Sequence, residues 1–481
     1  MAKREEIAGQ GLIILDATGV ADRYGTTERL AQTGGRVLHR YGSRILIGDV
    51  PATATRKASA ARGVLSYHAG AAREVPKRLT ECETLGLGAW NLRQSARFAT
   101  AKDNRPHNGQ RWDDASPTAP IPPDGPGMTH IGDEGPAGVR AFGPGDETSL
   151  YLIGSIAVGL IIVEGPTPDL QFSDEERTKV VAEVQEGLTW LGRQEPKAHV
   201  SFSYDIRTVR IARAPDPTLS GYEPLESHWR DPGIAKLGFA PNMGGVTEYV
   251  RTIRRNLGTR WGYVGLFTKY PTQHFAYALK PRLVMQYSND GWGADNIDRV
   301  FTHETGHIFG CPDEYTASNC SCDTKCGYLR ERNGNCQPCA TPFVDCLMAG
   351  NTWAMCSSTP AHLGWRDSDG DGALDPVDPV GNPNPVIDLG RICALVPFLC
   401  QLIGLGKAAG AVGGPVGVAG IPAGVEQPQM VPIDLLRQVL SADEMARVES
   451  AIRSEELHYL EALERKLQMA ARQIARERAR G

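Results

Sequence analysis

Two histidines spaced four residues apart constrain the fold of this chain more than any other feature. His303 and His307 stand in the stretch VFTHETGHIFGCPDEY, with Glu304 beside the first. An α-helix turns once every 3.6 residues, so both imidazoles project from one helix face, where two nitrogens can hold one metal ion. Gly310 then allows the chain to leave the helix in a conformation that other residues avoid, and Asp313 follows. The pattern therefore predicts a helix, a tight turn and a third ligand.

These residues resemble the extended HExxHxxGxxH motif of the metzincin metalloproteases, some of which have Asp in the last place. The matching positions are His303, Glu304, His307, Gly310 and Asp313. The resemblance implies a zinc-dependent endopeptidase that acts on a protein or peptide substrate. His303, His307 and Asp313 would bind Zn²⁺, and Glu304 would be the general base that deprotonates the zinc-activated water.

The resemblance also implies a methionine turn beneath the metal. DCLMAG supplies Met348 at a suitable distance, and Met355 in WAMC is the second candidate. Glu314 follows Asp313 directly, so Glu314 is the third ligand if the turn is one residue longer. No tyrosine follows Met348 closely, in contrast to some metzincins. The alternative hypothesis is a catalytically silent binding or structural module that keeps a metal-stabilised metalloprotease scaffold.

Eight of the 11 cysteines lie between Cys311 and Cys356, in a segment with little helix or strand signal. Their even number and density favour four disulfides and an oxidising compartment. We therefore expect an exported or extracellular protein, although the N-terminus shows no standard secretory signal. A structural zinc held by Cys336 and Cys339 with two of three neighbouring cysteines is the alternative. The disulfide candidates are Cys311, Cys320, Cys322, Cys326, Cys336, Cys339, Cys346 and Cys356.

The stretch DSDGDGALDPVD places carboxylates at positions 1, 3, 5, 9 and 12 of a loop, with a glycine at position 6. This spacing resembles the calcium loop of EF-hands, with Asp in place of the usual Glu at position 12. Prolines follow the loop and rule out a normal exiting helix, so it is more similar to the loops of thrombospondin type 3 repeats. The expected Ca²⁺ ligands are Asp367, Asp369, Asp371, Ala373 (through its carbonyl), Asp375 and Asp378; the alternative is an unliganded acidic turn.

The chain is 481 residues long, more than one hydrophobic core usually supports, so we expect several folded units. The N-terminal region reads βαββαβ, a ferredoxin-like order that resembles the propeptide or inhibitor domains of subtilisin-type proteases. The expected units are 1–100 for this propeptide-like or inhibitory domain, 101–148 for a Pro/Gly-rich linker, 149–366 for the metzincin-like domain, 367–380 for the calcium loop, 381–432 for a Gly/Pro-rich apolar linker and 433–481 for an amphipathic helix.

The fold class expected for the metzincin-like domain is α+β, a mixed twisted sheet backed by helices, one of which carries the metal site. The expected strands are 155–165, 199–211, 263–271 and 274–288. The expected helices are 173–194, 244–258 and one that begins near Ile297. Ser173 and Glu176 form a predicted capping box. We expect the segment ALKPRLVMQYS to be an edge strand that pairs with an extended substrate.

Charge and hydropathy limit the remaining partners. The formal net charge of −5 argues against nucleic-acid binding. The apolar segment 392–406 contains Pro397 and Gln401 and is shorter than the ~20 residues of a spanning helix, so we expect no membrane span. The C-terminal helix has one apolar stripe, which favours packing on the protein or, alternatively, an assembly partner.

Overall fold

The computed structural model describes residues 9–21, 23–32, 34–73, 76–114, 148–368, 370, 372–377, 386–388 and 430–432. The described residues up to Arg366 form one compact unit, and those from Asp367 form another. The described chain is a mixed α/β protein with ten α-helices and a nine-stranded mixed sheet.

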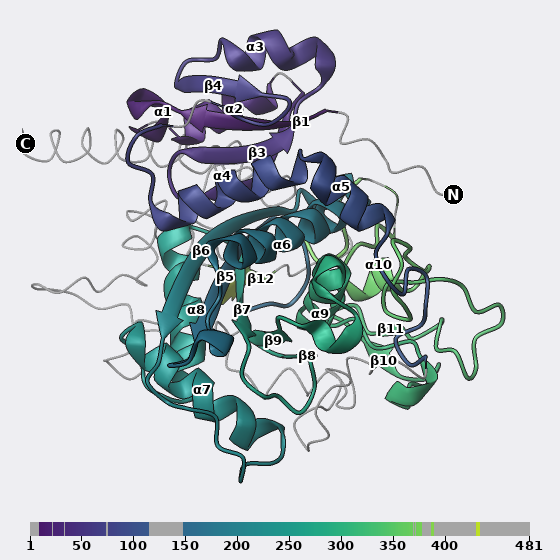
Figure 1. Cartoon of the computed structure of the whole chain (residues 1–481). Helices are drawn as coiled ribbons and strands as arrows, with labels where there is room; N and C mark the ends of the chain where they lie inside the picture. The colour runs from purple at the N-terminus through teal and green to yellow at the C-terminus, as the bar shows by residue number, and fades with distance from the viewer. Residues whose placement is uncertain are drawn as a thin grey trace, which may run out of the picture. The chain divides into compact units, whose positions relative to one another are not determined.

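The sheet of the larger unit has the strand order β4-β1-β3-β2-β6-β5-β7-β9-β8 (Figure 1). Strands β1 to β4 pair antiparallel, the pairs β2·β6, β6·β5, β5·β7 and β7·β9 are parallel, and β8 is antiparallel to β9. The strands are β1 (Gln10–Leu15), β2 (Arg36–Tyr41), β3 (Ile45–Asp49), β4 (Val64–His68), β5 (Ser155–Glu164), β6 (Ser201–Arg210), β7 (Trp261–Thr268), β8 (Ala276–Leu279) and β9 (Arg282–Gln286).

The predicted edge strand is divided by the structure. The segment 278–288 begins in β8, which is the edge strand, and continues into β9, which lies between β7 and β8. The edge prediction was therefore wrong for β9, because the chain reverses at Lys280 and Pro281 and brings β8 to its outer side.

The N-terminal strands β1 to β4 belong to the same sheet as β5 to β9. The join is the parallel pair β2·β6, in which His39 lies opposite Phe202 and Tyr41 opposite Tyr204. The Tyr41 and Tyr204 rings stack with centroids 4.4 Å apart, and the His39 ring contacts the Tyr204 hydroxyl at 2.9 Å and Thr189 Oγ1 at 2.8 Å. Strands from both sides of the boundary expected at residue 100 thus belong to one sheet. That residues 1–100 are removed as a propeptide, or inhibit the rest of the chain, stays a prediction.

Helices cover both faces of the sheet. Side chains alternate along a strand, so Val264 of β7 packs in the core with α7 and α8, whereas Phe267 stacks on Phe301 of α9 on the other face. The helices are α1 (Ala17–Ala21), α2 (Arg23–Ala31), α3 (Thr55–Ser59), α4 (Glu81–Arg93), α5 (Ala96–Asp103), α6 (Asp174–Gln194), α7 (Tyr222–Lys236), α8 (Met243–Leu257), α9 (Ile297–Ile308) and α10 (Thr359–His362).

The helices predicted within 149–366 are confirmed as α6, α8 and α9. The capping box of α6 is present, since Glu176 N donates to Ser173 Oγ at 3.1 Å and Ser173 N to the Glu176 carboxylate at 2.7 Å. Helices α4, α5 and α7 were not predicted. A second capping box, Thr80 with Glu83, opens α4 and was the signal available in the sequence.

In the smaller unit, β12 (Val386–Asp388) pairs antiparallel with β13 (Met430–Pro432). The predicted helix over 433–481 lies outside the described residues. Among the residues that are described, no helix has the length and apolar character needed to cross a membrane.

Candidate metal centre

Three predicted ligand atoms converge on one point at the end of α9. The Nε2 atoms of His303 and His307 are 3.0 Å apart, and each lies 3.2 Å from Asp313 Oδ1. Gly310 makes this possible, since its φ of +95° turns the chain and a Cβ there would lie 2.8 Å from the Cα of Gly327. The turn therefore brings Asp313 to the histidines, as predicted.

Glu314 points elsewhere. Its carboxylate accepts hydrogen bonds from Asn335 Nδ2 at 2.6 Å, Cys356 Sγ at 3.0 Å and Thr359 Oγ1 at 3.3 Å. Burial and the neighbouring Cys356 raise the pKa of Glu314 to about 8. Between the two ligand candidates, the structure brings Asp313 to the histidines.

The hydrogen bonds of the two imidazoles show that the site suits a cation. His303 Nδ1 lies 3.1 Å from the Leu347 carbonyl oxygen, and His307 Nδ1 lies 2.8 Å from that of Cys311. A carbonyl oxygen only accepts, so both Nδ1 atoms carry hydrogen and both neutral rings direct an Nε2 lone pair at Asp313 Oδ1. Lone pairs that meet at 3.0–3.2 Å repel unless a positive charge lies between them. Two imidazoles and one carboxylate suit Zn²⁺.

The pKa values also indicate that these side chains favour a positive charge between them. Burial opposes protonation of His307, but the Asp313 carboxylate outweighs burial and raises its pKa to about 9. Burial lowers the pKa of His303. At Asp313, burial favours the neutral acid, but the neighbouring His307 and His303 hold the pKa well below its usual range. The Asp313 carboxylate thus favours a positive charge where it meets the two Nε2 atoms.

Glu304 lies next to this point and has no polar partner. Both of its carboxylate oxygens are buried without a hydrogen-bond partner among the described residues. Burial raises the pKa of Glu304 to about 8. A cation held by the neighbouring ligands would favour the ionised form. Burial of a carboxylate without a hydrogen-bond partner lowers the stability of the folded protein. The position of Glu304 beside the candidate ligands therefore indicates a functional role.

Met348 packs against α9. Its side chain is buried, and an ideal Cβ on Gly306 would lie 2.9 Å from its Sδ atom. Two hydrogen bonds connect this turn to the candidate ligands. Leu347 O accepts one from His303 Nδ1, and Met348 O accepts one from Glu314 N at 3.0 Å. Met355, the second candidate, is only half-buried.

Residues of the segment 101–114 contact the turn around Met348, which was not predicted from the sequence. The Trp112 ring lies edge-on to His303, with centroids 5.3 Å apart, and its Nε1 donates to Leu347 O at 2.7 Å. Arg111 forms a β-bridge with Gly350. The Pro/Gly-rich composition of 101–148 suggested a linker, but its first part is held against the metal turn. Residues 115–147 lie outside the described chain.

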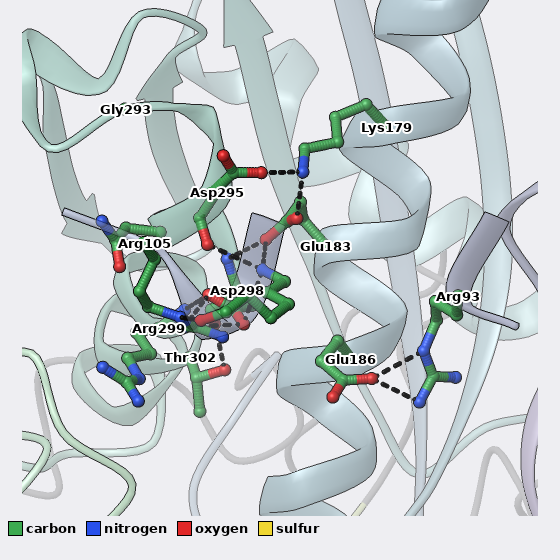
Figure 2. Close-up of polar contacts among 12 residues, drawn as sticks. Arg93, Arg105, Lys179, Glu183, Glu186, Gly293, Asp295, Asp298, Arg299 and Thr302 are labelled. Atoms are coloured by element: carbon green, nitrogen blue, oxygen red, sulfur yellow. Dashed lines mark hydrogen bonds and ion pairs between the residues drawn. The ribbon is translucent and has the colours of Figure 1, made fainter. Parts of the chain in front are cut away.

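A buried charge cluster joins α9 to α5 and α6 (Figure 2). Asp298 of α9 receives Lys102 Nζ at 2.8 Å and Arg105 Nη1 at 3.1 Å, and Lys102 also pairs with Glu183 of α6. Lys179 joins Glu183 to Asp295. The Asp298 and Glu183 side chains are fully buried. Lys102 lies in α5 and Arg105 in the turn after it, so the N-terminal region supplies the cations that pair with Asp298 of α9.

The electrostatics of the cluster follow from burial and from these cations. Burial raises the pKa of Glu183. At Asp298 burial acts in the same direction, but Arg105 and Lys102 outweigh it and lower the pKa to about 2. Asp298 is therefore the ionised partner of the two cations.

The cysteine-rich loop contains two of the expected disulfides, Cys320–Cys336 and Cys322–Cys339. These bonds occupy the sulfurs of the CxxC pair on which the alternative structural zinc depended. The other four candidates, Cys311, Cys326, Cys346 and Cys356, are thiols in this structure.

The predicted calcium loop is described only in part. Asp367 accepts hydrogen bonds from the backbone N–H of Gly370 and Gly372, at 2.8 and 3.1 Å. Asp375 accepts both from Ser368 N, at 2.8 Å, and from its hydroxyl. The remaining proposed carboxylate ligands, Asp369, Asp371 and Asp378, lie outside the described residues, and Ca²⁺ binding stays a prediction.

No protein-family model matches this chain, and no curated protein matches it. The function is therefore argued from the chemistry of the site.

Proposed function

We propose that this protein is a zinc-dependent endopeptidase of metzincin type. The observation that carries the proposal is the convergence of His303, His307 and Asp313 on one point, with the unpartnered carboxylate of Glu304 beside it. The mixed sheet, with its antiparallel edge strand packed near α9, supports a metzincin-like domain. The order β4-β1-β3-β2 supports a ferredoxin-like arrangement of the N-terminal strands.

Each residue has a defined role in peptide hydrolysis. Zn²⁺ held by the two imidazoles and the carboxylate supplies Lewis acidity towards a peptide carbonyl and lowers the pKa of water. Glu304 accepts a proton from the attacking water at its carboxylate and delivers it to the leaving amine nitrogen. The Leu347 and Cys311 carbonyls hold the His303 and His307 rings in the required tautomer.

Solvent exposure indicates the side from which a substrate approaches. The side chain of His307 is 15% exposed, that of Asp313 6% and that of His303 0%. The edge strand β8 packs against α9. An extended peptide that adds to the outer side of β8 would be held in register by backbone hydrogen bonds, which require no particular sequence.

The burial of Glu304 and His303 is what favours the alternative, a silent module in which the metal is structural. Cleavage of an unfolded protein such as casein separates the two functions. We expect the full chain to lose cleavage after dialysis against a zinc chelator and to recover it when one equivalent of Zn²⁺ is restored. His307→Ala should bind less zinc and stay inactive. Stoichiometric zinc without cleavage would instead establish the silent module.

A further inference from the structure

A second cluster of reactive side chains lies beside the metal turn. Cys346 and Cys356 are thiols in this structure and both are buried. Their sulfur atoms and a carboxylate oxygen of Glu314 lie within 4.8 Å of one another. Thr359 Oγ1 contacts the two sulfurs at 3.3 and 3.2 Å. The two thiols are thus held together inside the protein.

The loop between these cysteines is the one that supports the metal ligands. Leu347 O binds the His303 ring, and Met348 lies against Gly306 of α9. Leu347 N donates to Ala354 O at 2.8 Å, which draws the two ends of the loop together. A covalent bond between the ends would fix the carbonyl that orients His303.

The neighbouring cysteines indicate what chemistry the pair undergoes. Cys320–Cys336 and Cys322–Cys339 are disulfides of the same cysteine-rich segment. An environment that oxidises these pairs also oxidises other adjacent thiols. The cluster suits a structural zinc ion less well. Its fourth group, after Glu314 and the two cysteines, is the neutral hydroxyl of Thr359, whereas structural zinc takes thiolate or imidazole ligands.

We propose that Cys346 and Cys356 are an oxidation site and form a third disulfide, which closes the loop beneath the metal centre. The oxidant is a low-molecular-weight disulfide such as oxidised glutathione. The Cys356 thiolate attacks it, forms a mixed disulfide and releases one glutathione thiolate. The Cys346 thiolate then attacks Cys356 Sγ and releases the second. Two protein thiols are oxidised, one glutathione disulfide is reduced to two thiols, and the two protons pass to the released thiolates.

The bond has a consequence for the metal centre. It restricts Leu347 and so pre-orients His303, and we expect the oxidised protein to bind Zn²⁺ about tenfold more tightly. This consequence rests on the proposed zinc site. The bond itself does not, so the disulfide and the peptidase proposal fail separately.

Peptide mapping tests the bond directly. The full chain is incubated with oxidised glutathione, unfolded, alkylated with iodoacetamide and digested without reduction by chymotrypsin, which cleaves after Trp353 inside the loop. We expect Cys346 and Cys356 in linked peptides that reduction separates. Alkylation of both residues, or linkage of either to Cys311 or Cys326, would overturn the proposal. So would a second equivalent of zinc that is lost in Cys346→Ser and retained in His303→Ala.

Zinc competition against a chelator measures the consequence. Cys346→Ala should bind zinc about tenfold more weakly than the oxidised parent and should not respond to glutathione disulfide. Cys82→Ser is the matched control, because Cys82 lies in α4 outside the cluster, and it should retain the parent affinity and response. Mapping of the parent could yield the linked Cys346–Cys356 peptide while Cys346→Ala binds zinc as tightly as the oxidised parent. That result would support the disulfide and reject its effect on zinc binding.

Discussion

His303 and His307 each use one ring nitrogen for a backbone carbonyl and present the other to Asp313. The ring orientations are therefore fixed by backbone carbonyls that are not among the three candidate ligands. This arrangement is what a preorganised metal site requires, because the binding free energy is not spent on ordering the ligands.

A histidine far from the metal gives a prediction for pH. Burial, and then the charges of Arg93, Arg193 and Arg36, lower the pKa of His39 well below 6.5 in the folded protein. The unfolded chain therefore binds a proton that the folded chain does not, so the stability from neutral His39 is present above pH 6.5 and is lost as the pH falls below it. When the pH falls from 7.5 to 5.5, both proteins should lose unfolding free energy. The loss in His39→Gln should be about 1 kcal/mol smaller than the loss in the parent.

Urea denaturation at the two pH values measures this difference. A chelator is present in all samples, so that the metal ligands do not contribute through zinc. Parallel loss of stability in the two proteins would show that His39 is not the group responsible.

The residues of the metal centre could be predicted because their spacing lies within one helix and one turn. Trp112 and Lys102 could not, because their partners are distant in sequence. Lys102 and Asp298 are 196 positions apart, and no local periodicity relates them. The choice between Asp313 and Glu314 also required the structure, because both residues follow the turn directly.

At the scale of elements, α6 and α9 approach closely at Gly187. A Cβ on this residue would overlap the Asp298 carbonyl oxygen and Thr302 Oγ1 of α9. We expect Gly187→Ala to push the helices apart, to destabilise the protein by about 2 kcal/mol and to weaken zinc binding. Gly192→Ala in the same helix is the matched control, since the nearest atom there is a Leu38 methyl at 3.3 Å. Equal effects of the two substitutions on zinc affinity would reject the close approach as the cause.

The buried pair Lys102–Asp298 joins α5 to α9. Lys102→Met leaves a buried carboxylate with one cation fewer, and we expect it to cost about 3–5 kcal/mol of unfolding free energy. The double variant with Asp298→Asn should cost less than the sum of the single variants. Arg255→Met, which breaks the exposed pair with Glu248, should cost below about 1 kcal/mol. Additive effects of the two buried substitutions in urea denaturation would contradict a direct pair.

Element prediction succeeded where one face of a segment is apolar and its start is capped, as in α6. It failed for α4, whose sequence ECETLGLGAWNLR has two glycines and a weak stripe, and which is buried on several sides. The edge strand was misassigned because sequence alone does not give the order in which β8 and β9 join the sheet.

At the scale of the molecule, the N-terminal region shares a sheet and a buried charge cluster with the region that contains the candidate metal ligands. We expect the two parts to stay together after the chain is cut. A specific protease site inserted within 115–147 allows cleavage of the folded protein, followed by size-exclusion chromatography in physiological salt. Co-elution of both fragments with zinc retained is the expected result. Release of the N-terminal fragment would favour a detachable propeptide.

Peptide cleavage by Glu304→Gln is the measurement that tests the central claim most directly. The amide keeps the size of the side chain and removes its ability to accept a proton from water. We predict zinc content equal to that of the parent and casein cleavage at least about a hundredfold slower. Cleavage at the parental rate with equal zinc would contradict the role of Glu304, and with it the proposed mechanism.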